Sequence, residues 1–287
     1  MRYLQLSAVL ACMAICAGCS EKSPFIPESN LVVIQGYLYG NELIRDIRVT
    51  STLRLGSVDT IAPPIKDAQV QLIKNGLCYL LDPLFWKPGY YRYSAGTTQE
   101  CPVCELKVEP GDTFKIEVVY FGKVAYAQTI VPLPPQGIAL SQDTVFVAAG
   151  SAPSYSDIKE DGLFADDSVV AVTVSWQDDG NSMYYVALEN KELFPQPIGP
   201  DYPFAKPGRY NSAPLTGDHF SIGMKNLTHF GRYQIKVYRL NQEYAELYLT
   251  RNQDSRDLNE PLSNVNNGLG VFTAFNGTSI DFRIEKK

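Results

Sequence analysis

An alternation of apolar and polar residues, broken by Pro and Gly turns, runs through most of this 287-residue chain and constrains its fold most strongly. Residues 69–74 (QVQLIK) and 113–120 (TFKIEVVY) show it clearly, and Asn75-Gly76 is a strong hairpin signal directly after the first. Successive side chains of a strand point to opposite faces, so the pattern predicts half-buried antiparallel strands. The 18 Tyr and 13 Phe residues favour pleated sheet as well.

The distribution of strands predicts two domains. Residues 31–133 hold about seven short expected strands, the profile of an antiparallel β-sandwich. Pro132-Leu133-Pro134-Pro135 cannot continue a sheet ladder and predicts the boundary. The expected strands cover residues 32–38, 47–53, 69–74, 90–93, 106–109, 113–120, 124–131, 144–147, 169–177, 183–189, 219–224, 233–240, 271–274 and 280–284.

The C-terminal domain, residues 134–287, is also expected to be mostly β. One segment departs from the alternation, because Tyr244, Leu247 and Tyr248 fall at helical spacing after a capping Asn241. We therefore predict one short helix near 242–251. The expected fold class is mainly β, with two antiparallel sandwich domains of the Ig-like or transthyretin-like kind.

The N-terminus predicts a lipoprotein. The apolar stretch Leu4–Ala17 is too short to span a membrane, which takes about 20 helical residues, and has the length of a secretory signal. Ala17-Gly18-Cys19 resembles the bacterial lipobox, with Cys16 where Leu is usual. We predict a signal peptide over 1–18 and lipidation of Cys19, whose acyl chains would stay in the bilayer. We also predict a polar tether over 19–30 between this anchor and the folded domain.

Three further cysteines follow the predicted cleavage site. Cys101-Pro102-Val103-Cys104 has the spacing of a redox motif, but the next residues alternate like a strand instead of opening a helix. We expect a structural disulfide from Cys78 to Cys101 or to Cys104, with one thiol left over.

Charge and composition exclude several kinds of function. The net charge of −6 argues against binding nucleic acid, because phosphate recognition requires a basic surface. His219 and His229 are the only histidines, and no nucleophile-elbow motif accompanies them. Gly268-Leu269-Gly270 lacks the Lys of a phosphate loop and fits a tight hairpin or bulge with a positive φ. We expect no catalytic residues, metal or cofactor; the alternative is a cell-envelope hydrolase with its site near His219 or His229.

Aromatic residues near prolines are the best candidates for contacting a partner. The stretch 194–210 (FPQPIGPDYPFAKPGRY) carries Phe194, Tyr202, Phe204 and Tyr210 among five prolines. Rings on such a constrained loop can be buried against a partner at little entropic cost. Trp86 and Tyr90 form a second candidate group. The alternative is that these rings cover the protein's own core.

Several segments together resemble a family of Bacteroidota outer-membrane lipoproteins, the domain of unknown function 4249 family. They are the lipobox, Val33–Leu38 (VIQGYL), Pro64–Gly76 (PIKDAQVQLIKNG), Val174–Asp178 followed by Tyr184-Tyr185, and Pro261–Phe272 (PLSNVNNGLGVF). The resemblance covers essentially the whole mature chain. It implies a lipid-anchored protein of the outer membrane, on its periplasmic or cell-surface face. It also implies a non-catalytic binding or accessory role beside a TonB-dependent transporter.

Overall fold

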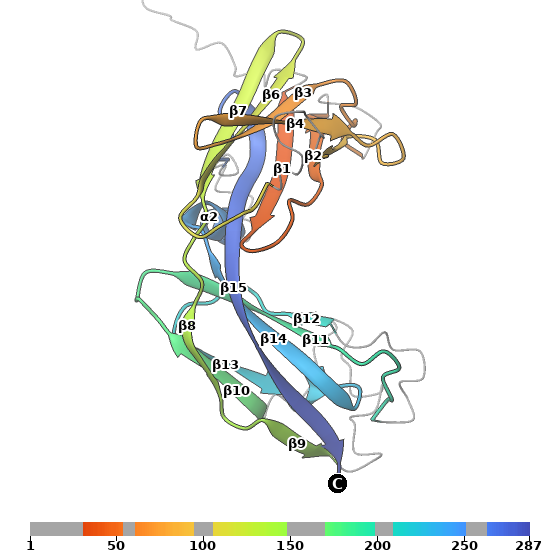
Figure 1. The fold of residues 1–287 in the computed structure, drawn as a ribbon, viewed down its shortest axis with the longest axis vertical. Helices are drawn as coiled ribbons and strands as arrows, with labels where there is room; N and C mark the ends of the chain where they lie inside the picture. Colours follow the sequence, from red (N-terminus) through yellow and green to blue (C-terminus); the bar gives the residue numbers. More distant parts are fainter. Residues whose placement is uncertain (1–30, 54–60, 95–105, 148–169, 199–208, 251–262) are drawn as a thin grey trace, which may run out of the picture.

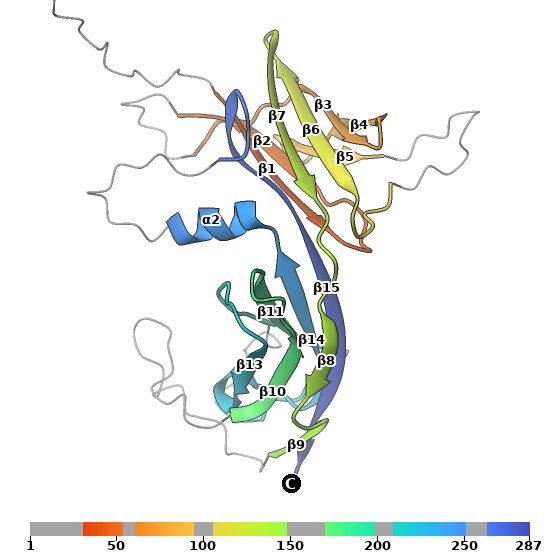
Figure 2. The same cartoon turned by 90° about the vertical axis from the view of Figure 1, so that its left-hand side faces the viewer.

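The structure, a computed structural model, describes residues 31–53, 61–94, 106–147, 170–198, 209–250 and 263–287. These residues are mainly β and include one α-helix. The chain forms two lobes stacked along its long axis, with one long strand running through both (Figures 1 and 2). Among the described residues, none of the helices combines the length and apolar character needed to cross a bilayer.

Seven strands build the upper lobe of Figure 1. They are β1 (Val32–Tyr39), β2 (Ile47–Ser51), β3 (Gln69–Lys74), β4 (Leu77–Pro83), β5 (Tyr90–Tyr93), β6 (Thr113–Tyr120) and β7 (Lys123–Ile130). They lie side by side in the order β1-β2-β5-β4-β3-β6-β7. Alternate residues of β1 and β6 are buried, as the alternation predicts. Ile34, Leu72, Tyr91, Phe114 and Ile116 are among the fully buried members of the core.

The lower lobe consists of two sheets that share a core. Its elements are β8 (Gln136–Leu140), β9 (Thr144–Val147), β10 (Val170–Gln177), β11 (Met183–Asn190), β12 (Arg209–Asn211), β13 (His219–Gly223), a 3₁₀ turn (Met224–Asn226) and β14 (Gly231–Leu240). The helix α2 (Gln242–Thr250) follows β14 and lies between the lobes (Figure 2). The strands β13-β10-β8 form one sheet, whereas β12-β11-β14 continue the sheet of the upper lobe. Val172 and Trp176 of the small sheet pack with Tyr184 and Ile235 of the large one. Burial of these side chains holds the two layers together.

The last strand, β15 (Gly268–Lys286), joins the lobes. Its first part pairs in parallel with β1 as far as Tyr39–Phe275, and its second part pairs antiparallel with β14 from Leu240–Phe275 onward. Sequence analysis predicts two strands, at 271–274 and 280–284, and this is corrected to one strand of 19 residues. The polar and glycine residues Asn276 and Gly277 do not end it, because they pair with Arg239 and Tyr238 of β14.

This strand bears directly on the predicted division into domains. Strands from both halves of the chain belong to one sheet, with the order β12-β11-β14-β15-β1-β2-β5-β4-β3-β6-β7. The mainly-β class and the short helix are confirmed, whereas a sandwich of two separate domains is not. The boundary predicted between 133 and 134 lies in the connection from β7 to β8. There Asn276 and Thr278 of β15 donate hydrogen bonds to the carbonyls of Pro132 (2.8 Å) and Pro135 (2.9 Å).

Candidate functional site

The predicted aromatic loop is only partly described. Phe194 follows β11 and is 85% exposed, with Leu193 beside it at 84%. Tyr210 lies on β12 and is half-buried, with its ring stacked on that of Phe220 at 6.1 Å between centroids. Tyr202 and Phe204 lie outside the described residues. Phe194 is therefore displayed to solvent, whereas Tyr210 packs within the lobe.

The second predicted group, Trp86 and Tyr90, also contains one exposed and one half-buried residue. Trp86 is 60% exposed and makes an edge-to-face contact with Phe85, which is 88% exposed; their ring centroids are 4.7 Å apart. Tyr90 is half-buried, and the Nζ of Lys87 lies 3.6 Å from the centre of its ring. The Phe85–Trp86 pair lies on the β4–β5 connection and is thus exposed to a partner.

The cysteine predictions stay predictions. Cys78 lies on β4, is exposed and has a free thiol. Cys101 and Cys104, its expected disulfide partners, lie outside the described residues, as does Cys19, the expected site of lipidation.

The two histidines occupy separate environments. His229 is buried, its Nδ1 lies 2.8 Å from the hydroxyl of Thr228, and its backbone N–H donates to the Tyr233 hydroxyl at 3.1 Å. Burial lowers the pKa of His229. His219 is exposed at the start of β13, with its Nδ1 2.7 Å from a carboxylate oxygen of Asp218. His229 is therefore a hydrogen-bonded residue of the core, and His219 is a surface residue that contacts the neighbouring Asp218.

Groups of metal-ligand type are also dispersed. Across the described ranges, no three His, Cys, Asp or Glu side chains lie close enough together to hold a metal ion.

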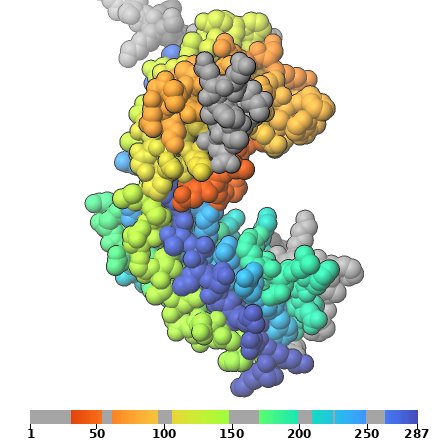
Figure 3. Space-filling model, viewed as in Figure 1, coloured from red at the N-terminus to blue at the C-terminus, as the bar shows by residue number. Residues whose placement is uncertain are grey.

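The described residues do converge at the junction of the lobes, where a pocket of about 280 Å³ opens. We call it the junction pocket. It is lined by Tyr37 and Tyr39 of β1, Tyr185 of β11, Asn211, Ser212 and Pro214 at and after β12, Tyr244 of α2, and Phe275 of β15. A hollow between the upper and lower lobes is visible on one side of the molecule (Figure 3). The wall of the junction pocket thus comes from both lobes.

Phe275 lines the junction pocket at the position where β15 changes partners. It is the last residue of β15 paired with β1 and the first paired with β14. Its ring contacts four tyrosine rings: Tyr37 stacked at 6.1 Å, Tyr39 at 5.4 Å, Tyr185 at 5.8 Å and Tyr244 at 4.9 Å. Such aromatic contacts add stability beyond area burial and fix ring positions.

The described residues that line the junction pocket are uncharged. Burial, reinforced by neighbouring tyrosines, raises the pKa of Tyr37 and of Tyr185 above the ordinary value of 10.0. Burial also raises the pKa of Tyr39, despite the opposing charge of Arg45. These hydroxyls therefore stay protonated at neutral pH. With Asn211 and Ser212 they give the aromatic wall hydrogen-bonding groups that carry no charge.

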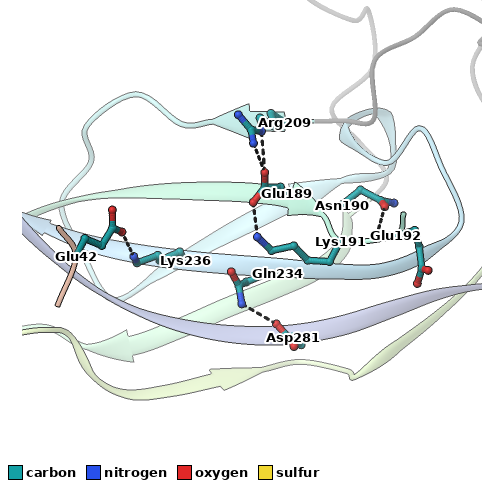
Figure 4. A network of polar contacts seen from close by, with 9 residues as sticks. All are labelled: Glu42, Glu189, Asn190, Lys191, Glu192, Arg209, Gln234, Lys236 and Asp281. Carbon is teal, nitrogen blue, oxygen red and sulfur yellow. Dashed lines mark hydrogen bonds and ion pairs between the residues drawn. The ribbon is translucent and has the colours of Figure 1, made fainter. Parts of the chain in front are cut away.

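Charged groups next to the junction pocket pair with one another (Figure 4). Lys236 of β14 donates to Glu42, on the β1–β2 connection, at 2.7 Å, and Arg45 donates to the same carboxylate at 2.7 Å. Burial would raise the pKa of Glu42, but its bonds to Lys236 and Arg45 outweigh this and lower it. The Glu42–Lys236 pair therefore connects the lobes beside the pocket.

The polar contacts continue along the outer face of β11, β14 and β15. Glu189 pairs with Lys191 and accepts from the Nε of Arg209 at 2.8 Å, and Gln234 donates to Asp281 at 3.3 Å (Figure 4). This face of the lower lobe is therefore polar, and the charge of Glu189 is paired with those of Lys191 and Arg209.

Sequence analysis missed the junction pocket. Tyr37, Tyr185 and Tyr244 lie within correctly predicted strands and the predicted helix. The sequence offers one signal: these tyrosines stand on the polar side of each alternation. A large ring at such a position faces away from the main core and needs another surface to pack against. The pairing of β1 with β15 determines which strand ends meet. Local periodicity in the sequence does not predict this pairing.

Comparison with known proteins adds no identity. A scan against protein-family models found no match, and a search of curated proteins found no significantly similar sequence. Function therefore has to be argued from the sequence motifs and from the junction pocket.

Proposed function

We propose that this chain is a non-catalytic binding lipoprotein, anchored to the outer membrane through Cys19, and an accessory subunit of a TonB-dependent uptake system. The observation that carries the binding role is the junction pocket, a concave site with aromatic walls and a few convergent polar groups. The lipobox supports the anchor, and the resemblance to the outer-membrane lipoprotein family supports the uptake system.

The chemistry of the junction pocket favours an uncharged ligand. Its walls offer the rings of Tyr37 and Tyr185 together with hydroxyl and amide groups, and none of the described residues that line it is charged. An ionic ligand would lose its hydration there without gaining a counter-charge. A neutral molecule with one apolar face and hydroxyl or carbonyl groups at its rim matches both kinds of group.

The exposed aromatic residues support a separate contact with the transporter. The Phe85–Trp86 pair lies on the upper lobe and the Leu193–Phe194 pair on the lower lobe. Large apolar side chains of this exposure are typical anchors of protein interfaces. Because these pairs are separate from the junction pocket, ligand and transporter can bind at the same time.

The ligand site is tested by native mass spectrometry of the lipidated protein isolated from its own outer membrane. We expect an uncharged small molecule to copurify, and Tyr185→Phe to reduce its occupancy because a hydroxyl at the pocket wall is lost. Tyr79→Phe is the matched control, since Tyr79 packs on Tyr93 away from the pocket. Equal occupancy in Tyr185→Phe and Tyr79→Phe would contradict the assignment of the site.

A further inference from the structure

The turn between β6 and β7 displays an aromatic side chain at one end of the molecule. Phe121 is 84% exposed, and its ring lies 4.4 Å from that of Tyr120. Lys123 follows and is also exposed. In both views this turn lies at the opposite end of the long axis from the C-terminus (Figures 1 and 2).

The backbone at this turn is unusual for the residue it carries. Phe121 has a φ of 46° and Gly122 one of 73°. The other described non-glycine residues with positive φ are Asn41, Asn75 and Asn267, and Asn is the residue that tolerates this region best. A bulky side chain in the left-handed region is strained, and such strain is typical of functional positions. The turn thus carries an exposed Phe where Asn or Gly would relieve strain.

The predicted lipid anchor enters the fold beside this turn. Leu31, the first described residue, lines a pocket of about 330 Å³ together with Val32, Tyr120 and Phe121. Eleven residues separate it from Cys19. An extended residue spans at most about 3.6 Å, so a lipid at Cys19 holds this end of the fold within about 40 Å of the bilayer.

We propose that the β6–β7 turn contacts the membrane, with Phe121 inserted at the boundary between headgroups and acyl chains. The proposal rests on the lipid anchor of the proposed function. Phe121 supplies the apolar side chain, Tyr120 is an amphipathic ring suited to the headgroup level, and Lys123 suits anionic lipid phosphates. One inserted side chain is a weak anchor by itself, but beside a lipidated N-terminus it orients the long axis away from the membrane.

The test places an indole at position 121. Trp86→Phe removes the exposed native tryptophan, and Trp176 is buried and shielded from quenchers. The lipidated Trp86→Phe, Phe121→Trp protein is reconstituted into phosphatidylethanolamine–phosphatidylglycerol vesicles with brominated acyl chains. We expect its fluorescence to shift to shorter wavelength and to be quenched by the brominated lipid. The protein with native Trp86 and Phe121 is the matched control and is expected to show no such quenching.

The outcomes separate this proposal from the anchor on which it rests. Vesicle-bound, lipidated protein whose indole at position 121 is unquenched would overturn the membrane contact alone. If this indole becomes protected only when the transporter is added, the turn is a protein contact and the proposal is wrong. If Cys19→Ala leaves the protein equally membrane-bound, the anchor itself is wrong, and the membrane contact falls with it.

A melting experiment gives a second, independent readout. We expect Phe121→Asn to leave the melting temperature unchanged or to raise it, because Asn relieves strain and little buried surface is lost. A clear fall would assign Phe121 to the packing of the fold and overturn the proposal.

Discussion

At the scale of single residues, burial has a larger effect than nearby charge on the pKa values of Tyr39 and Tyr185 in the junction pocket. Tyr39 lies under Arg45, whose guanidinium is 4.1 Å from the ring centre, and yet burial dominates its pKa. Tyr185 lies between Tyr238, stacked at 4.5 Å, and Phe275. A buried hydroxyl among aromatic rings resists ionisation because its anion would lose hydration without gaining a cation.

This burial predicts how stability depends on alkaline pH. The pKa of Tyr185 is raised in the folded protein above its ordinary value of 10.0, so below that pH both states keep the proton and stability is constant. Above about pH 10 only the unfolded chain releases it, and stability falls by up to about 1.4 kcal/mol per pH unit for this tyrosine. Denaturant unfolding at a series of alkaline pH values measures the slope.

Tyr185→Phe is the control for that slope, because it removes the ionisable hydroxyl and keeps the ring. We expect the variant to lose stability less steeply as the pH rises. An unchanged slope would mean that Tyr185 ionises as an exposed tyrosine does, and that the pocket wall is more solvated than its burial indicates.

At the scale of elements, the local sequence predicts the positions of individual strands well, but it predicts poorly which strands pair with one another. Strands 69–74 and 144–147 have the predicted bounds, and the helix begins at Gln242 as predicted. β4 was missed because Leu77 and Leu80 are apolar and exposed, which breaks the alternation. The parallel pairing of β1 with β15 joins opposite ends of the chain, and no turn signal encodes it.

Gly270 makes that parallel pairing possible. Its φ is positive, 108°, as predicted, but the expected hairpin is corrected, because Gly270 lies inside a continuous strand. A Cβ at this position would lie 2.0 Å from the carbonyl oxygen of Ile34 in β1. We expect Gly270→Ala to destabilise the protein by about 3 kcal/mol or more, since strained φ and backbone overlap add. Chemical denaturation measures this loss.

Gly76→Ala provides the matched comparison. Gly76 also has a positive φ, 81°, but a Cβ there would meet nothing within 4 Å. We expect a loss of only about 1 kcal/mol from the backbone alone. Similar losses for the two variants would contradict the close contact between β15 and β1.

At the scale of the whole molecule, β15 makes the lobes depend on each other. The upper core includes Phe272 and Ala274, and the lower core includes Phe282 and Ile284, all from this strand. Removing β15 would expose an edge of β1 and open both cores. The lobes are therefore expected to unfold as one cooperative unit.

A fragment of residues 31–133 tests this dependence. We expect it to lack a cooperative unfolding transition, because it has lost the neighbour of β1 and part of its core. A covalently linked segment covering 263–287 is expected to restore at least part of the fold. If the fragment alone gave a sharp transition with native-like near-ultraviolet circular dichroism, the upper lobe would be an independent domain, as the Pro132–Pro135 run suggested.

The measurement that tests the central claim most directly is quantitative affinity isolation of the lipidated protein from its native outer membrane. We predict that a TonB-dependent transporter copurifies with the wild-type protein and is reduced by the double variant Trp86→Ala, Phe194→Ala. Phe146→Ala is the matched control, because Phe146 is 61% exposed on β9, outside the Phe85–Trp86 and Leu193–Phe194 pairs; it should recover the transporter fully. Isolation of lipidated wild-type protein without any transporter would contradict the account.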